Sequence, residues 1–270
     1  MTGSYASLRR IWGLLYRHIS LYRASWPRLL ELAYWPVLQM CIWGFTASFI
    51  AARMGTSRAA LAGTALLGGV LLWEVALRSQ MGVAISFMEE MWSRNLGHIF
   101  VSPLRPWELV AALIGMSIIR MSAGVLPAVG IAYLLYAFNL FALGPVLVLF
   151  FANLMIMGWW VALGVVSLIL RHGAGAEALA WSVLFGLTPF SAVFYPVSVL
   201  PAVVRPLALA LPSAHVFEGM RAVLNQGVIR WDHLVWAVVL NAVWTVAASV
   251  VFARQFRAAR VRGALLSIGE

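Results

Sequence analysis

Two adjacent carboxylates, Glu89 and Glu90, come closest to a catalytic arrangement in this sequence. They lie in a polar stretch, residues 88–108, which interrupts a very apolar chain and also contains His98. Carboxylates beside a histidine can transfer protons during a reaction. The same residues can instead form a solvated or arginine-binding surface, with His98 packed or facing a partner, and the sequence favours this second interpretation.

The usual nucleotide- and metal-binding motifs are missing from the sequence. The chain has no Lys, so it cannot form the Gly-x-x-x-x-Gly-Lys-Ser/Thr phosphate loop. It also lacks a serine nucleophile elbow and a His-Glu-x-x-His helix. Neither the single Cys41 nor the scattered histidines have the spacing of zinc ligands. We therefore expect no catalytic residue, no metal and no cofactor on this chain.

Three charged residues, Glu74, Arg78 and Arg120, fall within long apolar runs. Charges inside a membrane are costly and commonly functional. Counted along helices, Glu74 lies about 20 Å above Phe87 and Arg120 about 18 Å above Glu108. This equal depth predicts a buried Glu74–Arg120 ion pair, which Arg78, one turn from Glu74, can join. The pair would either lock two helices together or form a polar patch that contacts a substrate.

The composition is that of a membrane protein. The chain is 63% hydrophobic and 10% charged, whereas soluble domains contain about 25% charged residues. Its formal charge of +10 comes from 19 arginines. Arginines at the ends of membrane helices explain this charge better than nucleic-acid binding does.

Six apolar runs are long enough to cross a hydrocarbon layer of about 30 Å. They cover residues 29–52, 60–87, 108–137, 146–170, 178–194 and 233–253. We expect an all-α polytopic membrane protein with one membrane domain, residues 1–270. Glycines such as Gly158 and Gly164 would allow close helix packing. Deeper tryptophans such as Trp43 and Trp181 could line a glycan channel, although simple packing is favoured.

An amphipathic helix precedes the first span. At helical spacing, residues 4–23 place one set of apolar side chains on one face and arginines on the other. The apolar set is Leu8, Ile11, Trp12, Leu15, Ile19 and Tyr22, and the opposite set is Arg9, Arg10 and Arg17. This pattern predicts a helix lying along the membrane surface and not a cleaved signal peptide.

The arginine distribution predicts the orientation. With both termini inside, 13 arginines lie inside and 5 outside, and Arg120 within a helix completes the 19. Such an excess marks the cytoplasmic side. We therefore expect a cytoplasmic loop at residues 88–107 and both termini in the cytoplasm.

Residues 195–231 do not fit a simple hairpin between the fifth and sixth spans. They contain Pro196, Pro201, Pro206 and Pro212, and their apolar part, 197–211, is too short and too broken to span. We predict a re-entrant pair of short helices that dips in from the extracytoplasmic side. An ordinary exposed loop is the alternative.

These motifs, taken in order, resemble those of type-2 ABC transporter permeases over essentially the whole chain. The family's outer signature is matched by Tyr195, Pro196, Ser198, Pro201, Pro212, Glu218 and Arg221. Leu211 departs from it, because Asn is common at that place. The polar stretch also matches, with an acidic residue at Glu89 or Glu90, a small turn at Gly97, and Ser102 before Pro103.

The resemblance implies a division of labour between chains. Two permeases would pair, and two ATPase subunits, which bind ATP and Mg, would dock beneath them. The surface helix and the polar loop are the family's main contacts with the ATPase, which here correspond to residues 8–22 and 89–106. The expected coupling residues are Glu89, Glu90, Arg94, His98, Arg9 and Arg10, and the re-entrant pair would line the outer exit.

We therefore expect the permease subunit of an ATP-driven exporter in a bacterial inner membrane. It would move an amphipathic or lipid-linked substrate, such as a glycolipid, a polysaccharide or a drug. Its partners would be the ATPase, a second permease copy and membrane lipid, but not nucleic acid. The alternatives are a secondary transporter or channel, which predicts inverted repeats and several buried carboxylates, and a membrane enzyme acting on lipids.

Overall fold

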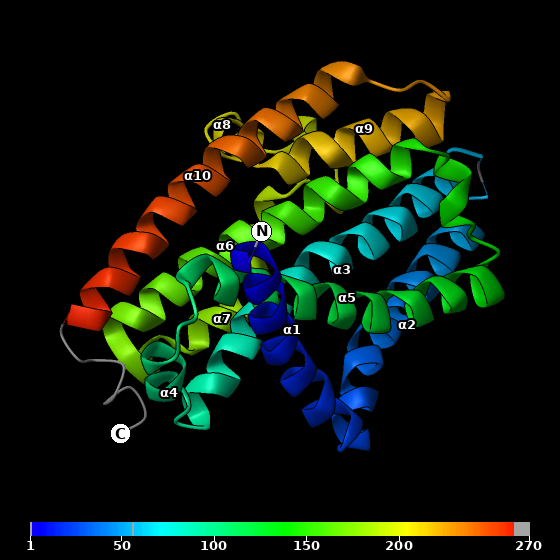
Figure 1. Ribbon diagram of the computed structural model, residues 1–270. Coiled ribbons are helices and arrows are strands. Elements are labelled where there is room, and N and C mark those ends of the chain that lie inside the picture. The colour runs from blue at the N-terminus through cyan, green and yellow to red at the C-terminus, as the bar shows by residue number, and fades with distance from the viewer. Residues whose placement is uncertain (1, 56, 262–270) are drawn as a thin grey trace.

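The computed structural model describes residues 2–55 and 57–261, which form helices and connecting turns without any strand (Figure 1). The α-helices are α1 Thr2–Arg23, α2 Trp26–Met54, α3 Ser57–Trp92, α4 Leu96–Val101, α5 Pro106–Tyr136, α6 Val146–His172, α7 Ala178–Leu187, α8 Arg205–Leu209, α9 Pro212–Gln226 and α10 Trp231–Val261. Four short 3₁₀ turns, η1 to η4, lie within this part, at Leu140–Leu143, Gly173–Ala176, Thr188–Phe190 and Val197–Val199.

Five helices within the described residues are long and apolar enough to cross a membrane. They are α2, the Leu61–Trp92 part of α3, α5, α6 and α10. The predicted all-α polytopic membrane fold is thus confirmed. Two ends of the bundle are named below: the loop end, which carries α4, and the far end, where α9 leads into α10 (Figure 1).

The fifth predicted span, residues 178–194, is shorter than expected. Its apolar helix covers Ala178–Phe190, which rises only about 20 Å at 1.5 Å per residue. Pro189 has no amide hydrogen to continue the helix, and Ala192 has the left-handed φ of 60°. The Tyr195 hydroxyl donates to the Pro189 carbonyl at 2.7 Å, which fixes the chain as it turns away. This segment is therefore about two thirds as long as the hydrocarbon layer is thick.

α3 is the central helix, and it packs against α2, α5 and α6. Two glycines bring its neighbours close. Gly82 of α3 lies against Ser117 of α5, and Gly158 of α6 lies against the backbone of Ala76. The Ser117 hydroxyl also donates to the Ser79 carbonyl at 2.8 Å. Close helix contact in membranes relies on such small residues and interhelical hydrogen bonds.

A buried polar cluster joins α6 to α10. The Asn241 side chain donates to the Asn153 carbonyl at 3.0 Å and to its Oδ1 at 2.9 Å. The Trp160 indole donates to Asn241 Oδ1 at 3.0 Å, and Trp244 stacks on Trp160 with ring centroids 5.3 Å apart. All of these polar atoms are therefore satisfied between the helices, as burial in an apolar environment requires.

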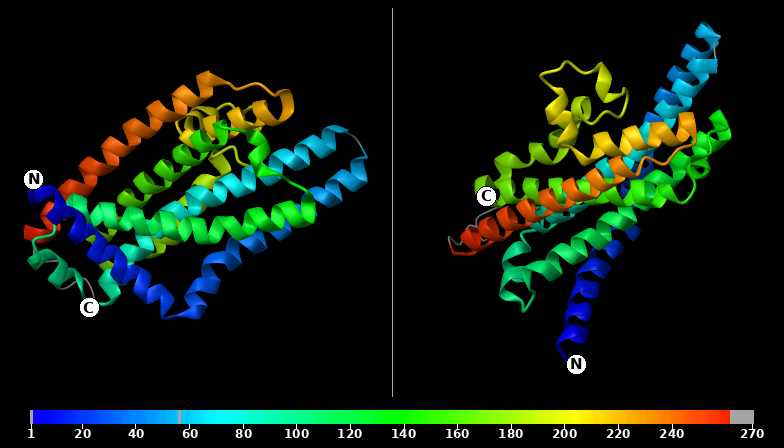
Figure 2. Two further views of the ribbon diagram at one scale, coloured as in Figure 1. Left: turned by 45° about the vertical axis from the view of Figure 1, so that its right-hand side comes forward. Right: turned by 90° about the horizontal axis from the view of Figure 1, so that it is seen from above.

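α1 lies across the bundle near the loop end, where it contacts α5 and α2 (Figures 1 and 2). Its predicted apolar face is divided in the structure. Tyr22 is buried against the bundle, whereas Leu8 and Trp12 remain 62% and 61% exposed. His18, a polar residue, is buried beside Tyr22. The packed face of α1 is thus set by hydrogen-bonding groups, and an apolar strip is left outside.

The predicted re-entrant region, residues 195–231, folds as η4, α8 and the 15-residue helix α9. Glu218 of α9 holds it together, because its carboxylate accepts from the Val197 amide at 2.7 Å and from Arg221 at 3.3 Å. Arg221 also donates to the Ala192 carbonyl at 2.9 Å. The acidic residue and arginine of the outer signature therefore tie α9 to the turn after α7, and Arg205 donates to two carbonyls of the same turn region.

A small change at the α3–α6 contact should reduce stability. In the Gly158→Ala variant the added Cβ would lie 2.6 Å from the Ala76 carbonyl oxygen, so the helices must separate. We expect a loss of about 1–3 kcal/mol in the free energy of unfolding, as for other overpacked sites, measured by thermal unfolding in detergent. Gly164→Ala on the same helix is the control, because nothing lies within 4 Å of its Cβ position. Equal melting temperatures would contradict this packing.

Candidate functional site

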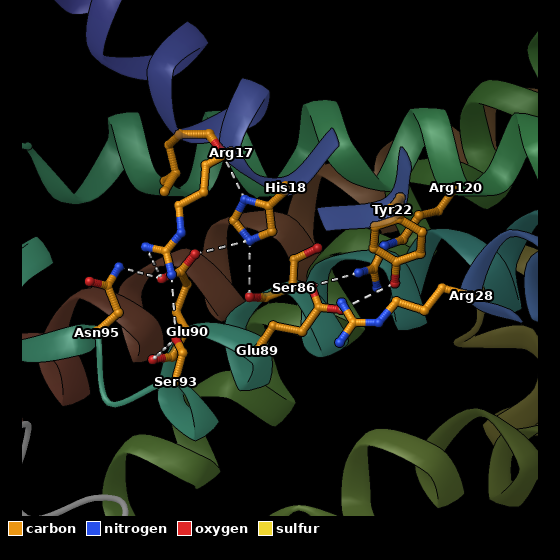
Figure 3. Close-up of polar contacts among 11 residues, drawn as sticks. Arg17, His18, Tyr22, Arg28, Ser86, Glu89, Glu90, Ser93, Asn95 and Arg120 are labelled. Carbon is orange, nitrogen blue, oxygen red and sulfur yellow. Dashed lines mark hydrogen bonds and ion pairs between the residues drawn. The ribbon is translucent and has the colours of Figure 1, made fainter. Parts of the chain in front are cut away.

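Glu89, in the last turns of α3, is the centre of a charge cluster that three other helices complete (Figure 3). Its Oε2 lies 2.8 Å from Arg120 Nη2 of α5, and its Oε1 accepts from the Tyr22 hydroxyl of α1 at 3.2 Å. Arg28 of α2 approaches the same oxygen at 3.7 Å. A single carboxylate thus connects α1, α2, α3 and α5.

Glu90, the next residue, forms a second cluster directed at α1 and the loop (Figure 3). Its carboxylate lies 2.9 Å from Arg17 and 3.3 Å from His18 Nε2, both on α1. Asn95 donates to it at 2.6 Å from the turn after α3. Glu90 is only 1% exposed, so these partners replace the water that its charge would otherwise require.

Glu108, at the start of α5, is held by α1 in the same way. Arg10 forms a two-pronged contact with it, through Nε at 2.9 Å and Nη2 at 2.5 Å, and this hydrogen bonding raises the pKa of Arg10 above its usual value. Bidentate arginine–carboxylate pairs are among the stronger polar contacts in proteins. α1 therefore binds all three acidic residues of the polar stretch.

Tyr22 has a double role in the first cluster. Burial raises its pKa to about 12, so the hydroxyl stays protonated at neutral pH and donates to Glu89. The face of its ring receives the Arg120 guanidinium, whose Cζ lies 4.5 Å from the ring centroid. This cation–π contact and the Glu89 ion pair together stabilise an arginine that is only 3% exposed.

The structure corrects the predicted pairing of the intramembrane charges. Glu74 is bound by Arg78 one turn away, Nε to Oε2 at 3.0 Å, and Arg120 is bound by Glu89 instead. Glu74 and Arg120 do line the same cavity, in keeping with their equal predicted depth. However, Arg120 extends over the Tyr22 ring toward the loop end and binds Glu89 there. Counting residues along the helices could not predict this partner.

The predicted coupling residues do not share one surface. Residues 89–92 of the predicted loop are the end of α3, and a separate short helix, α4, covers Leu96–Val101. Arg94, with a φ of 53°, marks the break between them. Glu89 and Glu90 are largely buried, so they bind within the chain, whereas Arg9 and His98 are exposed.

A cavity of about 450 Å³ opens beside the Glu89 cluster. It lies between α2, α3, α5 and α7, and its wall combines six charged side chains with aromatic ones such as Trp35, Trp92 and Trp181. A second cavity of about 370 Å³ continues from it, with Gln39, Glu74, Leu77 and Phe185 lining both. Trp43 and Phe194 line this second cavity and stack with ring centroids 4.5 Å apart.

A further cleft, of about 400 Å³, separates α1 from the loop that carries α4. It is lined by Arg10, Gly13, Leu14, Arg17, Asn95, His98, Ser102, Pro103 and Leu104. Basic and polar side chains line the cleft, and there is open space beside Gly13. It thus offers a concave surface for another molecule at the loop end.

Among the residues whose side chains are described, no three His, Cys, Asp or Glu side chains gather to hold a metal ion. Glu74, Glu89, Glu90 and Glu108 each form an ion pair with an arginine.

Sequence reasoning missed the partners Arg17, His18, Tyr22 and Arg28. The sequence did contain one signal. Arg17 and His18 lie within the predicted surface helix, and its predicted position did not account for a histidine there. The packing of α1 brings Arg17 and His18 to Glu90 and Tyr22 to Glu89. Arg28 reaches Glu89 from α2.

Membrane-length helices around a cavity lined by charged and aromatic side chains define a membrane transport component. A family model described as "ABC-2 type transporter" matches residues 9–225. The chain therefore belongs to the ABC-2 type transporter family and is a membrane-spanning permease. Permeases of this family generally work with an ATPase subunit. A comparison with curated proteins gave no match.

A double-mutant cycle should distinguish the two possible partners of Arg120. Replacing Glu89 and Arg120 by Gln, singly and together, should show a coupling of about 1–3 kcal/mol in the free energy of unfolding, because the residues touch. The same cycle with Glu74 and Arg120 should be additive to within about 0.5 kcal/mol. Thermal or denaturant unfolding in detergent gives these values, and the reverse result would restore the Glu74–Arg120 pair.

Proposed function

We propose that this permease is the transmembrane subunit of an ATP-driven exporter in a bacterial inner membrane. The loop end and both termini face the cytoplasm, as the 13 to 5 distribution of arginines favours. ATP and Mg bind to the partner ATPase and this chain carries no cofactor, in keeping with the absence of a phosphate loop from its sequence.

The observation that carries this proposal is the pair of joined cavities. The larger begins at the Glu89 cluster near the loop end, and the smaller reaches Phe194 and Tyr195 beside the outer signature. Polar groups at the entrance and aromatic walls beyond them suit an amphipathic or lipid-linked substrate. Glycolipids, polysaccharides carried on a lipid and amphipathic drugs all belong to this chemical group. The Trp43–Phe194 stack forms part of the wall of the smaller cavity.

A second copy of the chain would complete the path. α2 forms one wall of the larger cavity, and only 22% of the residues in its most apolar stretch are buried. Its exposed residues include Leu29, Phe45 and Phe49. In a single copy this helix forms only the edge of the cavity. Pairing through α2 would enclose the cavity between two subunits and leave the remaining apolar helices to contact lipid.

The ATPase would act on the α1–α4 cleft. α1 is bound to the ends of α3 and α5 through Glu90 and Glu108, so a force applied at the cleft reaches the cavity walls without bending a loop. Of the predicted coupling residues, Arg10 and His98 line the cleft. Glu89 and Glu90 would transmit the force inside the chain.

Filling the cleft tests this docking site. Gly13 has nothing within 4 Å of its Cβ position, so Gly13→Leu occupies the cleft and also improves the intrinsic helix propensity of α1. We expect the variant to insert and melt normally but to co-purify with the ATPase at a small fraction of the wild-type yield. Arg94→Glu should also weaken assembly while leaving membrane insertion intact.

Gly130→Leu on α5 is the matched control, because it also has open space at its Cβ position and lies outside the cleft. It should co-purify normally. Normal co-purification of Gly13→Leu would refute the docking site. ATP hydrolysis by the purified permease alone would refute the proposed function itself.

A further inference from the structure

The charges around the larger cavity sum to zero. Three arginines and three glutamates line it: Arg28, Arg78, Arg120, Glu31, Glu74 and Glu89. Most of the remaining lining residues are apolar or aromatic. A ligand with a net charge would add an unbalanced charge to this poorly solvated space, which costs free energy. The cavity therefore favours a ligand whose own charges sum to zero.

Four of the six charged groups already form ion pairs with one another. Arg78 binds Glu74 at 3.0 Å and Arg120 binds Glu89 at 2.8 Å, and these four side chains are between 3% and 14% exposed. A ligand that took one member of either pair would leave the other buried without a counter-charge. These pairs thus keep the cavity neutral but are not free to hold a head group.

Arg28 and Glu31 are the remaining two, and both have free hydrogen-bonding capacity. The Arg28 side chain is 44% exposed and lies 3.7 Å from Glu89, and its Cζ lies 5.9 Å from the centroid of the Tyr22 ring. Glu31 is exposed, and it makes no ion pair within the part of the chain that the structure describes. Three residues apart on α2, they lie on one helix face with Cβ atoms about 5–6 Å apart. In Figure 3 Arg28 lies on the α2 side of Glu89, away from the Glu90 cluster.

The next turns of the same face of α2 are apolar and aromatic. Leu32 and Trp35 follow Glu31 into the cavity, where Trp181 and Phe185 of α7 line another part of the wall. Trp35 and Trp181 are 49% and 44% exposed, so their rings are accessible to a ligand. The order along α2 is therefore cation, anion, then apolar wall.

We propose that this cavity binds an amphiphile with a zwitterionic head group, in which Arg28 binds the anionic group and Glu31 the ammonium group. The apolar part of the ligand lies against Trp35, Trp181 and Phe185. The assignment rests on the proposed function in that it takes this cavity as the substrate path. It names the class of head group that the permease selects there.

Three amphiphiles with the same alkyl chain test the head group. The full-length permease, purified in the uncharged detergent dodecyl maltoside, would be titrated with radiolabelled dodecylphosphocholine, dodecyltrimethylammonium and dodecyl phosphate. Because the chains are equal, differences in affinity report the head group. We expect the zwitterion to bind roughly fivefold more tightly than either ion, because it forms one partly exposed ion pair more than each of them.

Single substitutions should change this order in opposite directions. Glu31→Gln removes the ammonium partner and should make dodecyl phosphate the preferred ligand, whereas Arg28→Gln should favour dodecyltrimethylammonium. Arg254→Gln is the control, because Arg254 is exposed on α10 and does not line the cavity. Unchanged thermal unfolding of each variant shows that the fold is intact.

The proposal is overturned if the wild-type permease binds the three amphiphiles equally or prefers an ion, or if Glu31→Gln leaves the order unchanged. The measurement needs no ATPase, so it separates the two hypotheses. Zwitterion preference without ATP-driven export would refute only the proposed function. Assembly with the ATPase but no head-group preference would refute only this inference.

Discussion

Two carboxylates at the end of α3 need counter-charges in a place that water reaches poorly, and much of the fold follows from this need. Glu89 and Glu90 are adjacent, so they point in different directions and require different partners. Glu89 binds an arginine of α5 and a tyrosine of α1. Glu90 binds an arginine and a histidine of α1. Breaking a buried ion pair costs about 3–5 kcal/mol, which is comparable to the whole stability of a small domain. The position of α1 across the bundle is therefore fixed by charge.

The sequence predicted the helical class and the long spans well, because apolar length is a direct consequence of membrane thickness. The predictions were wrong where one side chain had more than one possible partner within reach. Arg120 and Glu74 lie beside one cavity as their depth predicted, but the length of an arginine side chain let Arg120 reach Glu89. The apolar face of α1 was also predicted from periodicity alone, and the burial of His18 shows that hydrogen bonding outweighed hydrophobicity there. The short α7 escaped notice because its residues are apolar enough to span, and Pro189 decides where it stops.

The same charges that hold α1 also form part of the cavity wall. Glu89 and Arg120 belong to both, so the surface helix and the cavity cannot change independently. A movement of α1 that disturbed Tyr22 would alter the environment of Arg120, and a ligand that displaced Arg28 would alter the surroundings of Glu89. α1 and the cavity are thus coupled by direct contact through one or two side chains. A longer pathway through the bundle is not needed.

The short length of α7 has a consequence for how the protein is made. A segment of this length cannot by itself halt passage through the insertion machinery, since the threshold is about 20 apolar residues. The turns after it leave the Val197 amide and the Ala192 carbonyl without a partner in the backbone ladder of a helix. Their partners are the side chains of Glu218 and Arg221, which leave the ribosome later. Residues 178–226 can therefore complete these contacts only after α9 has been synthesised and has packed against α6 and α10.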